Sequence, residues 1–370
     1  MLGDVLSWDQ TVFKNGEMFE LDYVPEHFRH RESQIEELMF SIRPAMKGMR
    51  PVNTLCLGPP GTGKTTAILK IFEEIEKHTA SVIPVHINCQ VDNTKYEIFS
   101  RIFQKIYGFA PPSSGVSFKK IFEKIVKYLI EKEKVLVVAL DDINYLFYES
   151  EVNDVLYTLL RAHEVQPKAR IGVIGVLSDI KMQYQLDPRV ASVFLPREIL
   201  FLPYTQDEIH DILSNRIQYG FFPGVVPEDI LDKIVEYVES SGDLRVGIDL
   251  LKKAGLNAER RASKCISLED VNEAYESSRS VHIQRAISSL GDEEKVLLRL
   301  IAEGEEVRAG ALYKKFQEKT NLRYTRFHEM LNKLDTTKLI NTRYSGKGTR
   351  GRSRLISVKN ADDILKGLRD

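Results

Sequence analysis

The segment GPPGTGKT, residues 58–65, constrains this chain more than any other feature. It has the spacing G-x-x-x-x-G-K-[ST]; the apolar run NTLCLG precedes it, and a helix is expected over 64–78. Gly58, Gly61 and Gly63 allow the backbone to form a ring whose N–H groups point at phosphate oxygens. A strand, this loop and a helix in succession predict a nucleotide-binding α/β domain.

Side chains of the loop and of a later strand have the chemistry of a metal–nucleotide site. Lys64 would reach the β- and γ-phosphates, and Thr65 would supply a hydroxyl group to Mg²⁺. The run VLVVALDD ends in two acids, of which Asp141 would hold Mg²⁺ through water and Asp142 would polarise the attacking water. We therefore expect ATP or ADP with Mg²⁺ as cofactors, bound around Pro60, Gly61, Thr62, Gly63, Lys64, Thr65 and Thr66.

Arg189 lies in the turn LDPRV, which follows the apolar strand IGVIGVLSD. An exposed arginine there could act on a nucleotide bound by a neighbouring subunit, or it could be an ordinary surface arginine. The spacing alone leaves both interpretations open.

The order of the predicted elements divides the chain into four parts. After an N-terminal extension, 1–20, strands alternate with helices over 21–200, and the strands lack polar alternation, which indicates an α/β core with a parallel sheet. From the capping box that begins at Thr205, the apolar spacing is helical only and predicts a helical lid over 201–286. The last part, 287–370, has the pattern of a winged helix: helices at 292–302, 308–319 and 322–334, then strands near 339–344 and 354–358.

Charge is distributed unevenly along the chain. The formal net charge is −1, but residues 291–370 hold 18 Lys and Arg against 12 Asp and Glu, while the remaining residues hold 34 against 41. The stretch between the last two predicted strands is glycine-rich and has no acid, a composition that suits contact with phosphates or a minor groove. The twelve residues 343–354 contain no acid, and their basic residues are Arg343, Lys347, Arg350, Arg352 and Arg354.

The helix predicted at 322–334 has two faces when its residues are placed at 100° intervals. The apolar side carries Tyr324, Phe327, Leu331 and Leu334. The other side carries Thr325, Arg326, Glu329, Asn332 and Lys333. Because the third helix of a winged helix enters the major groove, we expect Thr325, Arg326, Asn332 and Lys333 to contact duplex DNA.

The composition excludes several classes of protein. Hydrophobic residues make up 43% and charged residues 28%, as in ordinary globular proteins. Three cysteines without a CxxC pair exclude a disulfide framework and a cysteine-rich zinc site. The start MLGDVLSWDQ lacks a secretory signal, and no apolar run approaches the ~20 residues that span a bilayer. We expect a cytoplasmic, nucleoid-associated protein with no membrane partner.

In the order and spacing of its segments, the chain resembles the archaeal replication initiators of the AAA+ class, relatives of the eukaryotic origin-recognition and helicase-loading ATPases. The resemblance covers nearly the whole chain: YVPEHFRHRESQIEEL, GPPGTGKTT (the Walker A motif), VLVVALDD, LDPRV, SGDLRVGIDLL and the basic winged-helix end. It implies an AAA+ P-loop ATPase core, a helical lid and a C-terminal winged helix. It also implies a protein that binds duplex origin DNA and helps place the replicative helicase there, and sister initiator subunits would be further partners.

The resemblance assigns roles to individual residues. Arg245 would read the γ-phosphate from the lid, and Arg189 would be the arginine finger. The segment 92–118 would be the initiator-type insertion that touches DNA beside the winged helix. The residues expected around the adenine are Tyr23, Val24, Pro25 and Arg31.

Two positions depart from the family pattern. Asp142 stands where the family usually has glutamate, and Ser178, followed by Asp179, stands where it tends to have asparagine. Aspartate is one methylene shorter, and a misplacement of ~1 Å can cost about a hundredfold in rate. We expect tight nucleotide binding with slow ATP hydrolysis, as in a weak ATPase that serves as a switch.

Two other functions fit part of the pattern. A clamp-loader-like AAA+ subunit would share the core and the lid, but its C-terminal domain would serve assembly and would not need a basic wing. An ATP-switched winged-helix transcription regulator would bind promoters and would make no contact with a helicase.

Overall fold

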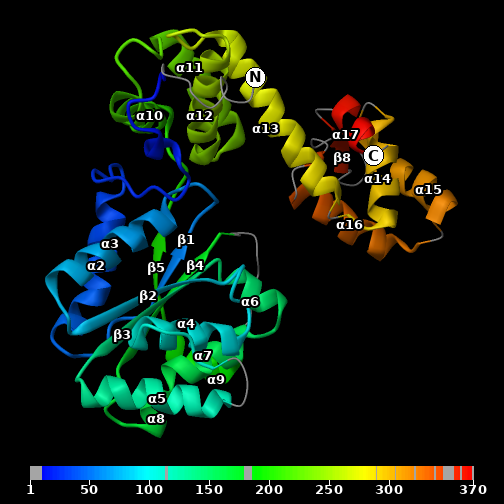
Figure 1. The fold of residues 1–370 in the computed structure, drawn as a ribbon. Coiled ribbons are helices and arrows are strands. Elements are labelled where there is room, and N and C mark those ends of the chain that lie inside the picture. Colours follow the sequence, from blue (N-terminus) through cyan, green and yellow to red (C-terminus); the bar gives the residue numbers. More distant parts are fainter. Residues whose placement is uncertain are drawn as a thin grey trace. The chain divides into compact units, whose positions relative to one another are not determined.

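The computed structural model describes residues 11–112, 116–178, 186–288, 290–304, 306–320, 322–336, 339–344, 354–358 and 361–368. The chain forms two compact units, Met1–Ser267 and Leu268–Asp370 (Figure 1). In the described ranges, no helix is both long enough and apolar enough to cross a membrane.

A five-stranded parallel sheet forms the centre of the first unit. Its strands, in spatial order, are β2 (Val82–Asn88), β3 (Val135–Asp141), β4 (Ile171–Leu177), β1 (Thr54–Leu57) and β5 (Arg197–Leu200). Every residue of β3 and β4 is buried. Continuous apolar runs therefore became central strands covered on both faces, as the sequence predicted.

Helices cover both faces of this sheet (Figure 1). One face packs on α2 (Glu32–Met46) and α3 (Lys64–His78). The other face packs on α4 (Lys95–Tyr107), α5 (Phe118–Glu131), α6 (Asn144–Tyr148), α7 (Val152–Leu160), α8 (Ala162–Val165) and α9 (Pro188–Phe194). The α/β core predicted from the sequence is confirmed.

The lid follows the core in the same unit. It contains α10 (Gln206–Gly220), α11 (Glu228–Ser241) and α12 (Leu244–Arg260). The expected capping box at Thr205 and Glu208 begins α10. The short 3₁₀ helix η1 (Gly16–Phe19) packs on α10 and α12, and the ring of Phe19 lies 4.6 Å from that of Phe221. The N-terminal extension is thus joined to the lid.

The second unit has the winged-helix arrangement. Its helices are α13 (Leu268–Ser288), α14 (Asp292–Ala302), α15 (Ala309–Thr320), α16 (Tyr324–Thr336) and α17 (Ala361–Gly367). Its antiparallel strands lie in the order β6 (Val307–Arg308), β8 (Arg354–Ser357) and β7 (Asn341–Tyr344). The sequence placed residues 268–286 in the lid, whereas spatial contacts group α13 with this unit, because Ile283 and Ile287 enter its core.

Strand order and register bring the expected site together at one edge of the five-stranded sheet. Leu57 pairs with Leu177, and Asn88 pairs with Asp141, so β1, β4, β2 and β3 all end at the same level. The backbone N–H of Gly58 then donates to the carbonyl of Leu177 at 3.3 Å. Loops at the carboxyl ends of parallel strands are where α/β proteins bind ligands.

Candidate nucleotide site and DNA-binding domain

The phosphate loop joins β1 to α3 and depends on two glycines. Gly61 and Gly63 have φ angles of 74° and 88°, in the region that favours glycine. Space imposes the same requirement, since a Cβ on Gly61 would collide with the Asp243 carboxylate and one on Gly63 would lie 2.7 Å from the Tyr204 hydroxyl oxygen. The loop therefore packs directly against residue 243 of the lid and against the segment that leads into it.

Lys64 is buried and contacts its own loop. Its Nζ donates to the carbonyl oxygens of Gly58 at 2.9 Å and Pro59 at 2.8 Å. Burial lowers the pKa of Lys64 to about 8, although the Asp142 and Asp141 carboxylates act in the opposite direction. A phosphate would offer this ammonium charged acceptors in place of two neutral carbonyls, which favours phosphate binding.

Thr62 stabilises the shape of the loop. Its hydroxyl donates to the carbonyl of Pro59 at 2.9 Å, and the residue is buried. Pro60 is exposed, and Thr66 is half-buried in the first turn of α3. The roles of these three residues as neighbours of the phosphates stay predictions.

Asp141 ends β3 beside the start of α3. Its Oδ2 accepts hydrogen bonds from the Thr65 hydroxyl at 2.7 Å and from Nε2 of His86 at 2.9 Å. Burial acts to raise the pKa of Asp141, but the bonds from His86 and Thr65 outweigh it and lower the pKa overall. A hydroxyl oxygen and an ionised carboxylate side by side are the hard oxygen ligands that Mg²⁺ prefers, so these residues fit the metal.

His86 was missed in the sequence. It lies on β2, distant in the chain from Asp141, and the two are brought together by the pairing of β2 with β3. No motif spacing could have identified it. The only available signal was a polar residue inside the otherwise apolar run SVIPVHINC.

The two residues that depart from the family pattern contact each other. The Ser178 hydroxyl donates to Oδ1 of Asp142 at 2.7 Å. Asp142 has a φ of 51°, which is uncommon for a residue with a side chain. The backbone thus turns sharply at Asp142, and its carboxylate is directed at the end of β4. Asp179 lies outside the described residues.

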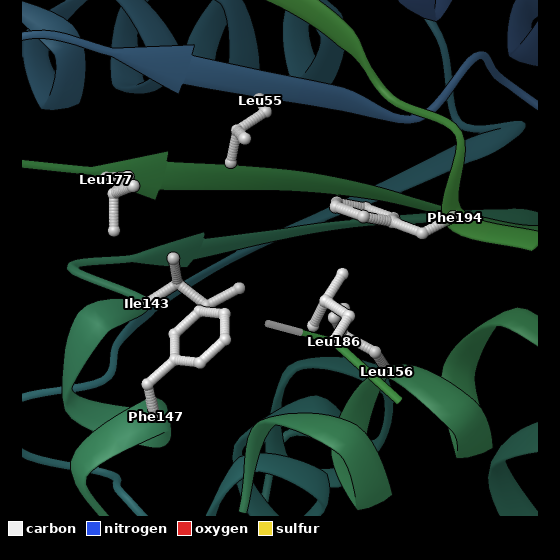
Figure 2. A pocket seen from close by; sticks show the side chains of 7 residues that line it. All are labelled: Leu55, Ile143, Phe147, Leu156, Leu177, Leu186 and Phe194. Carbon is white, nitrogen blue, oxygen red and sulfur yellow. The ribbon is translucent and has the colours of Figure 1, made fainter. Parts of the chain in front are cut away.

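An apolar space is lined in part by residues next to this pair in the chain (Figure 2). Ile143 and Leu177, the chain neighbours of Asp142 and Ser178, form part of its lining. The remaining lining residues are also apolar: Leu55, Phe147, Leu156, Leu186 and Phe194. Among the described residues, no polar side chain lines this space to meet a phosphate or a base, so it belongs to the core.

Arg245 comes from the first turn of α12 in the lid. Its guanidinium pairs with Asp243, with Nη2 at 2.6 Å from Oδ2 and Nε at 2.9 Å from Oδ1. The bond to Asp243 raises the pKa of Arg245, and the Asp142 carboxylate adds to that effect. Arg245 therefore lies within electrostatic reach of the phosphate loop, where its predicted role requires it to be.

Arg31, expected near the adenine, makes several contacts within the chain. Its Nε donates to the carbonyl of Thr62 at 2.9 Å and its Nη2 to the carbonyl of Leu202 at 2.7 Å. The guanidinium also lies 3.6 Å from the ring centroid of Tyr204, and the residue is buried. Arg31 therefore connects the phosphate loop to the segment entering the lid, and its contact with the adenine stays a prediction.

The other expected base neighbours precede Arg31. The ring of Tyr23 lies under the guanidinium of Arg216 on α10, at 4.7 Å. Val24 and Pro25 are half-buried. Their contact with the adenine stays a prediction.

Arg189 lies in the first turn of α9, with 76% of its side chain exposed. Its guanidinium pairs with Asp187, the cap of its own helix, at 3.0 Å. An exposed arginine held by a neighbouring carboxylate is compatible with a finger and with an ordinary surface residue, so both interpretations stay open.

The expected insertion at 92–118 forms α4 and the start of α5. Phe99 of α4 packs edge-on against Phe118 at 5.0 Å, and Arg101 pairs with Asp92 at 2.8 Å. Residues 113–115 of this segment lie outside the described residues. Its contact with DNA stays a prediction.

The third helix of the winged helix, α16, buries most of the predicted apolar face. Phe327, Leu331 and Leu334 are buried, whereas Tyr324 is 49% exposed. Tyr324 begins the helix, where its ring lies 5.9 Å from that of Phe327 and 5.1 Å from that of Tyr313, and Met330 occupies the core in addition. Tyr324 therefore lies on the predicted side of the helix, at its partly exposed end.

The predicted DNA-facing side of α16 is exposed, and three of its residues have partners. Arg326 pairs with Glu329 at 3.0 Å. Lys333 donates to Glu294 of α14 at 2.7 Å, and Asn332 accepts a bond from Arg354. Thr325 is exposed. The Arg326–Glu329 pair is exposed, and such an ion pair is weak enough for a phosphate to replace it. The partners of Lys333 and Asn332, which are Glu294 and Arg354, are buried.

Arg354 is a correction to the predicted basic wing. Only 8% of its side chain is exposed. It donates to Asn332 at 2.7 Å, to Asp335 at 3.1 Å and to Thr342 at 3.3 Å, so it joins α16, β7 and β8. A guanidinium used in this way is part of the domain's framework and is not available to DNA.

The other basic residues of the wing divide into two groups. Arg343 on β7 is 72% exposed and forms a bidentate pair with Glu306, with both N–O distances at 2.8 Å. Lys347, Arg350 and Arg352 lie outside the described residues. The contacts of all four with DNA stay predictions.

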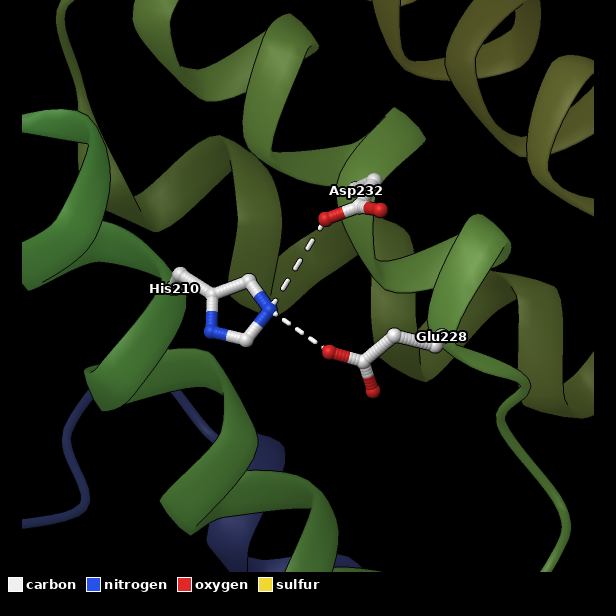
Figure 3. A group of neighbouring side chains, drawn as sticks. All are labelled: His210, Glu228 and Asp232. Carbon is white, nitrogen blue, oxygen red and sulfur yellow. Dashed lines mark hydrogen bonds and ion pairs between the residues drawn. The ribbon is translucent and has the colours of Figure 1, made fainter.

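One histidine in the lid is surrounded by acids (Figure 3). Nε2 of His210 on α10 lies 3.0 Å from Glu228 and 3.8 Å from Asp232, which are one turn apart on α11. The two carboxylates are largely exposed. The group is accounted for as an ion pair that joins two lid helices.

Comparisons with known proteins agree with this architecture. Residues 49–178 match the AAA domain, 210–276 match the Cdc6 AAA+ ATPase-type lid domain, and 295–366 match the CDC6 C-terminal winged helix domain.

Relatives match over nearly the whole chain. The chain is 53% identical to "ORC1-type DNA replication protein 2" of Methanosarcina acetivorans, over 99% of this chain and 98% of that protein. It is 50% identical to "ORC1-type DNA replication protein 6" of Halobacterium salinarum, over 98% and 97%. The solved structure of Aeropyrum pernix ORC1 in complex with DNA is similar with a TM-score of 0.77 and 26% identity, over 98% of this chain and 97% of that one. The chain therefore belongs to the ORC1-type DNA replication proteins, the archaeal initiators of the AAA+ class.

Proposed function

We propose that this chain is a nucleotide-switched replication initiator. It binds ATP or ADP with Mg²⁺ at the phosphate loop, binds duplex origin DNA through its C-terminal unit, and helps place the replicative helicase on that DNA. The observation that carries the proposal is the match to ORC1-type proteins over 99% of the chain, with core, lid and winged helix in one polypeptide. The DNA in the similar Aeropyrum pernix complex supports the second step.

The nucleotide part rests on residues that converge from separate elements. Lys64 would exchange its carbonyl partners for phosphate oxygens, and Thr65 with Asp141 would hold the metal. Bound Mg²⁺ would neutralise phosphate charge. Arg245 would close over the phosphates from the lid, because its guanidinium already lies within electrostatic reach of Asp142 and Lys64.

Slow hydrolysis fits the contact between Asp142 and Ser178. A carboxylate that accepts a hydrogen bond from Ser178 is held at the end of β4. Activating a water molecule would require an acceptor within hydrogen-bonding reach of that water. The short Asp142 side chain meets that need poorly while Ser178 holds it, so the nucleotide state would persist and act as a switch.

Partners other than DNA follow from the same proposal. Arg189 is exposed on α9, and a finger of this kind would complete the site of a sister initiator. The replicative helicase would be the other protein partner, and the proposed site of action is the nucleoid.

The observations bear differently on the two alternative functions, a clamp-loader-like subunit and a transcription regulator. A clamp-loader-like subunit receives no support, because residues 295–366 match a CDC6 winged helix. A transcription regulator with a winged helix remains the competitor that an experiment must separate from an initiator.

Titration of the full chain with two duplexes tests the proposal. One duplex comes from a mapped replication start of the source organism, and the other has the same composition in scrambled order. We expect preference for the first duplex in the presence of MgATP, maintained as salt is raised, whereas non-specific affinity should fall steeply with salt. Equal affinities at every salt concentration would contradict the proposal, and preference for a promoter duplex would favour the regulator.

A further inference from the structure

His86 contacts the metal-binding carboxylate from a strand outside the phosphate loop. Its Nε2 lies 2.9 Å from Oδ2 of Asp141. An ionised carboxylate can only accept hydrogen bonds, so Nε2 must carry the proton that joins the two groups. The imidazole is therefore a donor to Asp141, and its place is set by β2.

The sheet fixes this contact. His86 pairs with Ala139 and Asn88 with Asp141 in the parallel ladder between β2 and β3, so His86 lies one pleat before the carboxylate on the neighbouring strand. Its side chain is about three-quarters buried, and only 8% of the Asp141 side chain is exposed. A donor on a central sheet is held more firmly than one on a loop, because the ladder restricts its backbone.

The Asp141 carboxylate accepts hydrogen bonds from three described donors, which differ in where they come from. Thr65 donates to Oδ2 at 2.7 Å, and the backbone N–H of Asp142 donates to Oδ1 at 3.1 Å. Thr65 is itself an expected metal ligand, and the Asp142 contact comes from the adjoining residue. His86 is the donor from a different strand that can set the rotation of the carboxylate independently of nucleotide and metal.

We infer that His86 is a positioning residue for the nucleotide-bound metal: it holds the Asp141 carboxylate beside the Thr65 hydroxyl and so sets how much Mg²⁺ the site requires. The inference rests on the proposed function, since it concerns the metal of that same site. Groups that orient metal-binding side chains typically contribute ten- to a hundredfold in metal affinity or activity.

Two substitutions of nearly equal size separate donation from packing. His86→Gln keeps an N–H donor at a similar reach, and His86→Met fills the same space without one. His78→Met, at an exposed histidine near the end of α3, serves as the control for loss of a histidine elsewhere. Binding of a fluorescent ADP analogue to the full chain is measured in EDTA and then at increasing Mg²⁺ concentrations.

For His86→Met we expect about a tenfold or greater rise in the Mg²⁺ concentration needed for half-maximal enhancement of binding. Affinity in EDTA should stay within about twofold of wild type, because Lys64 and the loop N–H groups are intact. His86→Gln should restore most of the Mg²⁺ response, and His78→Met should match wild type. Thermal unfolding of each variant without nucleotide or metal confirms that the proteins compared are folded.

Three results would overturn the inference. The first is a Mg²⁺ requirement in His86→Met equal to that of wild type. The second is a rise in the Mg²⁺ requirement that is equally large in His86→Met and His86→Gln. The third is a loss of nucleotide affinity in EDTA as large as the loss in Mg²⁺. Failure of the proposed function looks different, because wild type itself would then bind no nucleotide under any of these conditions.

Discussion

The Ser178 hydroxyl donates a hydrogen bond of 2.7 Å to the Asp142 carboxylate, so the two residues that depart from the family pattern are partners. Each is shorter than the residue usually found at its position. Together they form a contact that neither substitution would explain alone. The two departures should therefore act on hydrolysis as a unit.

Asp142→Glu is expected to raise the rate of ATP hydrolysis, by up to about a hundredfold, because the added methylene moves the carboxylate by about 1 Å toward an attacking water. Single-turnover hydrolysis by the purified chain measures it. Ser178→Ala distinguishes the effect of side-chain length from that of the hydrogen bond, because it removes the bond to Asp142 without lengthening the Asp142 side chain. A double-mutant cycle should show coupling between the positions. An unchanged or reduced rate in Asp142→Glu would reject the explanation of slow turnover.

Nucleotide affinity should fall as pH rises above 8. In the free protein the pKa of Lys64 is lowered to about 8 by burial, and only the charged ammonium attracts phosphates. Above that pH, binding must return a proton to Lys64, which weakens affinity by about tenfold per pH unit. Calorimetric titrations in buffers of different ionisation enthalpy would detect the uptake. Affinity that stays constant from pH 7 to 9 would contradict this prediction.

The lowered pKa of Lys64 also makes the free energy of unfolding depend on pH, in the opposite direction to the nucleotide affinity. Between pH 8 and the ordinary range of a lysine, the unfolded chain binds a proton that the folded chain has released, so the contribution of Lys64 to stability rises with pH. Lys64→Met removes this contribution. Its free energy of unfolding should therefore depend less on pH in that window than that of wild type.

Arg189→Ala should leave ATP binding by the isolated chain unchanged. The side chain is exposed and held by Asp187 on its own helix. If it acts on a neighbour's nucleotide, hydrolysis should fall only in an assembly of two or more initiators. Weaker binding by the single chain would show that Arg189 acts within its own site or supports the fold.

Arg343→Ala and Arg354→Ala should affect different properties. Arg343 is exposed, so its loss should weaken binding to all duplexes alike and lower the salt slope by about one unit, with little change in stability. Arg354 is buried among Asn332, Asp335 and Thr342, so its loss should cost about 3 kcal/mol of stability in the C-terminal unit. Salt-dependent DNA titrations and thermal unfolding distinguish them. Equal stability of the two variants would remove the structural role of Arg354.

Local patterns in the sequence were sufficient to predict the fold and to locate the phosphate loop and the acidic end of β3. The loop glycines, the apolar run of β3 and the capping box at Thr205 each have a cause within a few residues, so a single sequence reveals them. The sequence also indicated Asp142 and Ser178 as unusual positions, but it could not show that they touch, because the helices α6, α7 and α8 separate β3 from β4 in the chain.

What the sequence could not reveal depends on contacts between distant segments. Nothing in the sequence indicated that Arg31 donates to the carbonyls of Thr62 and Leu202. Arg354 was counted with the basic wing, although it shares the buried side of β8 with Ile356. The alternation of buried and more exposed residues along so short a strand is a weaker signal than the five basic residues close together in the sequence, so Arg354 was grouped with them.

The most direct test of the initiator function is a chromatin-enrichment map of the intact protein, compared with replication starts mapped by marker frequency in the same cells. Membership of the ORC1-type family predicts sharp enrichment at one or a few loci that coincide with replication starts, and loss of those peaks when Lys64 is changed to alanine. Enrichment at promoters away from any replication start, unchanged by that substitution, would contradict it.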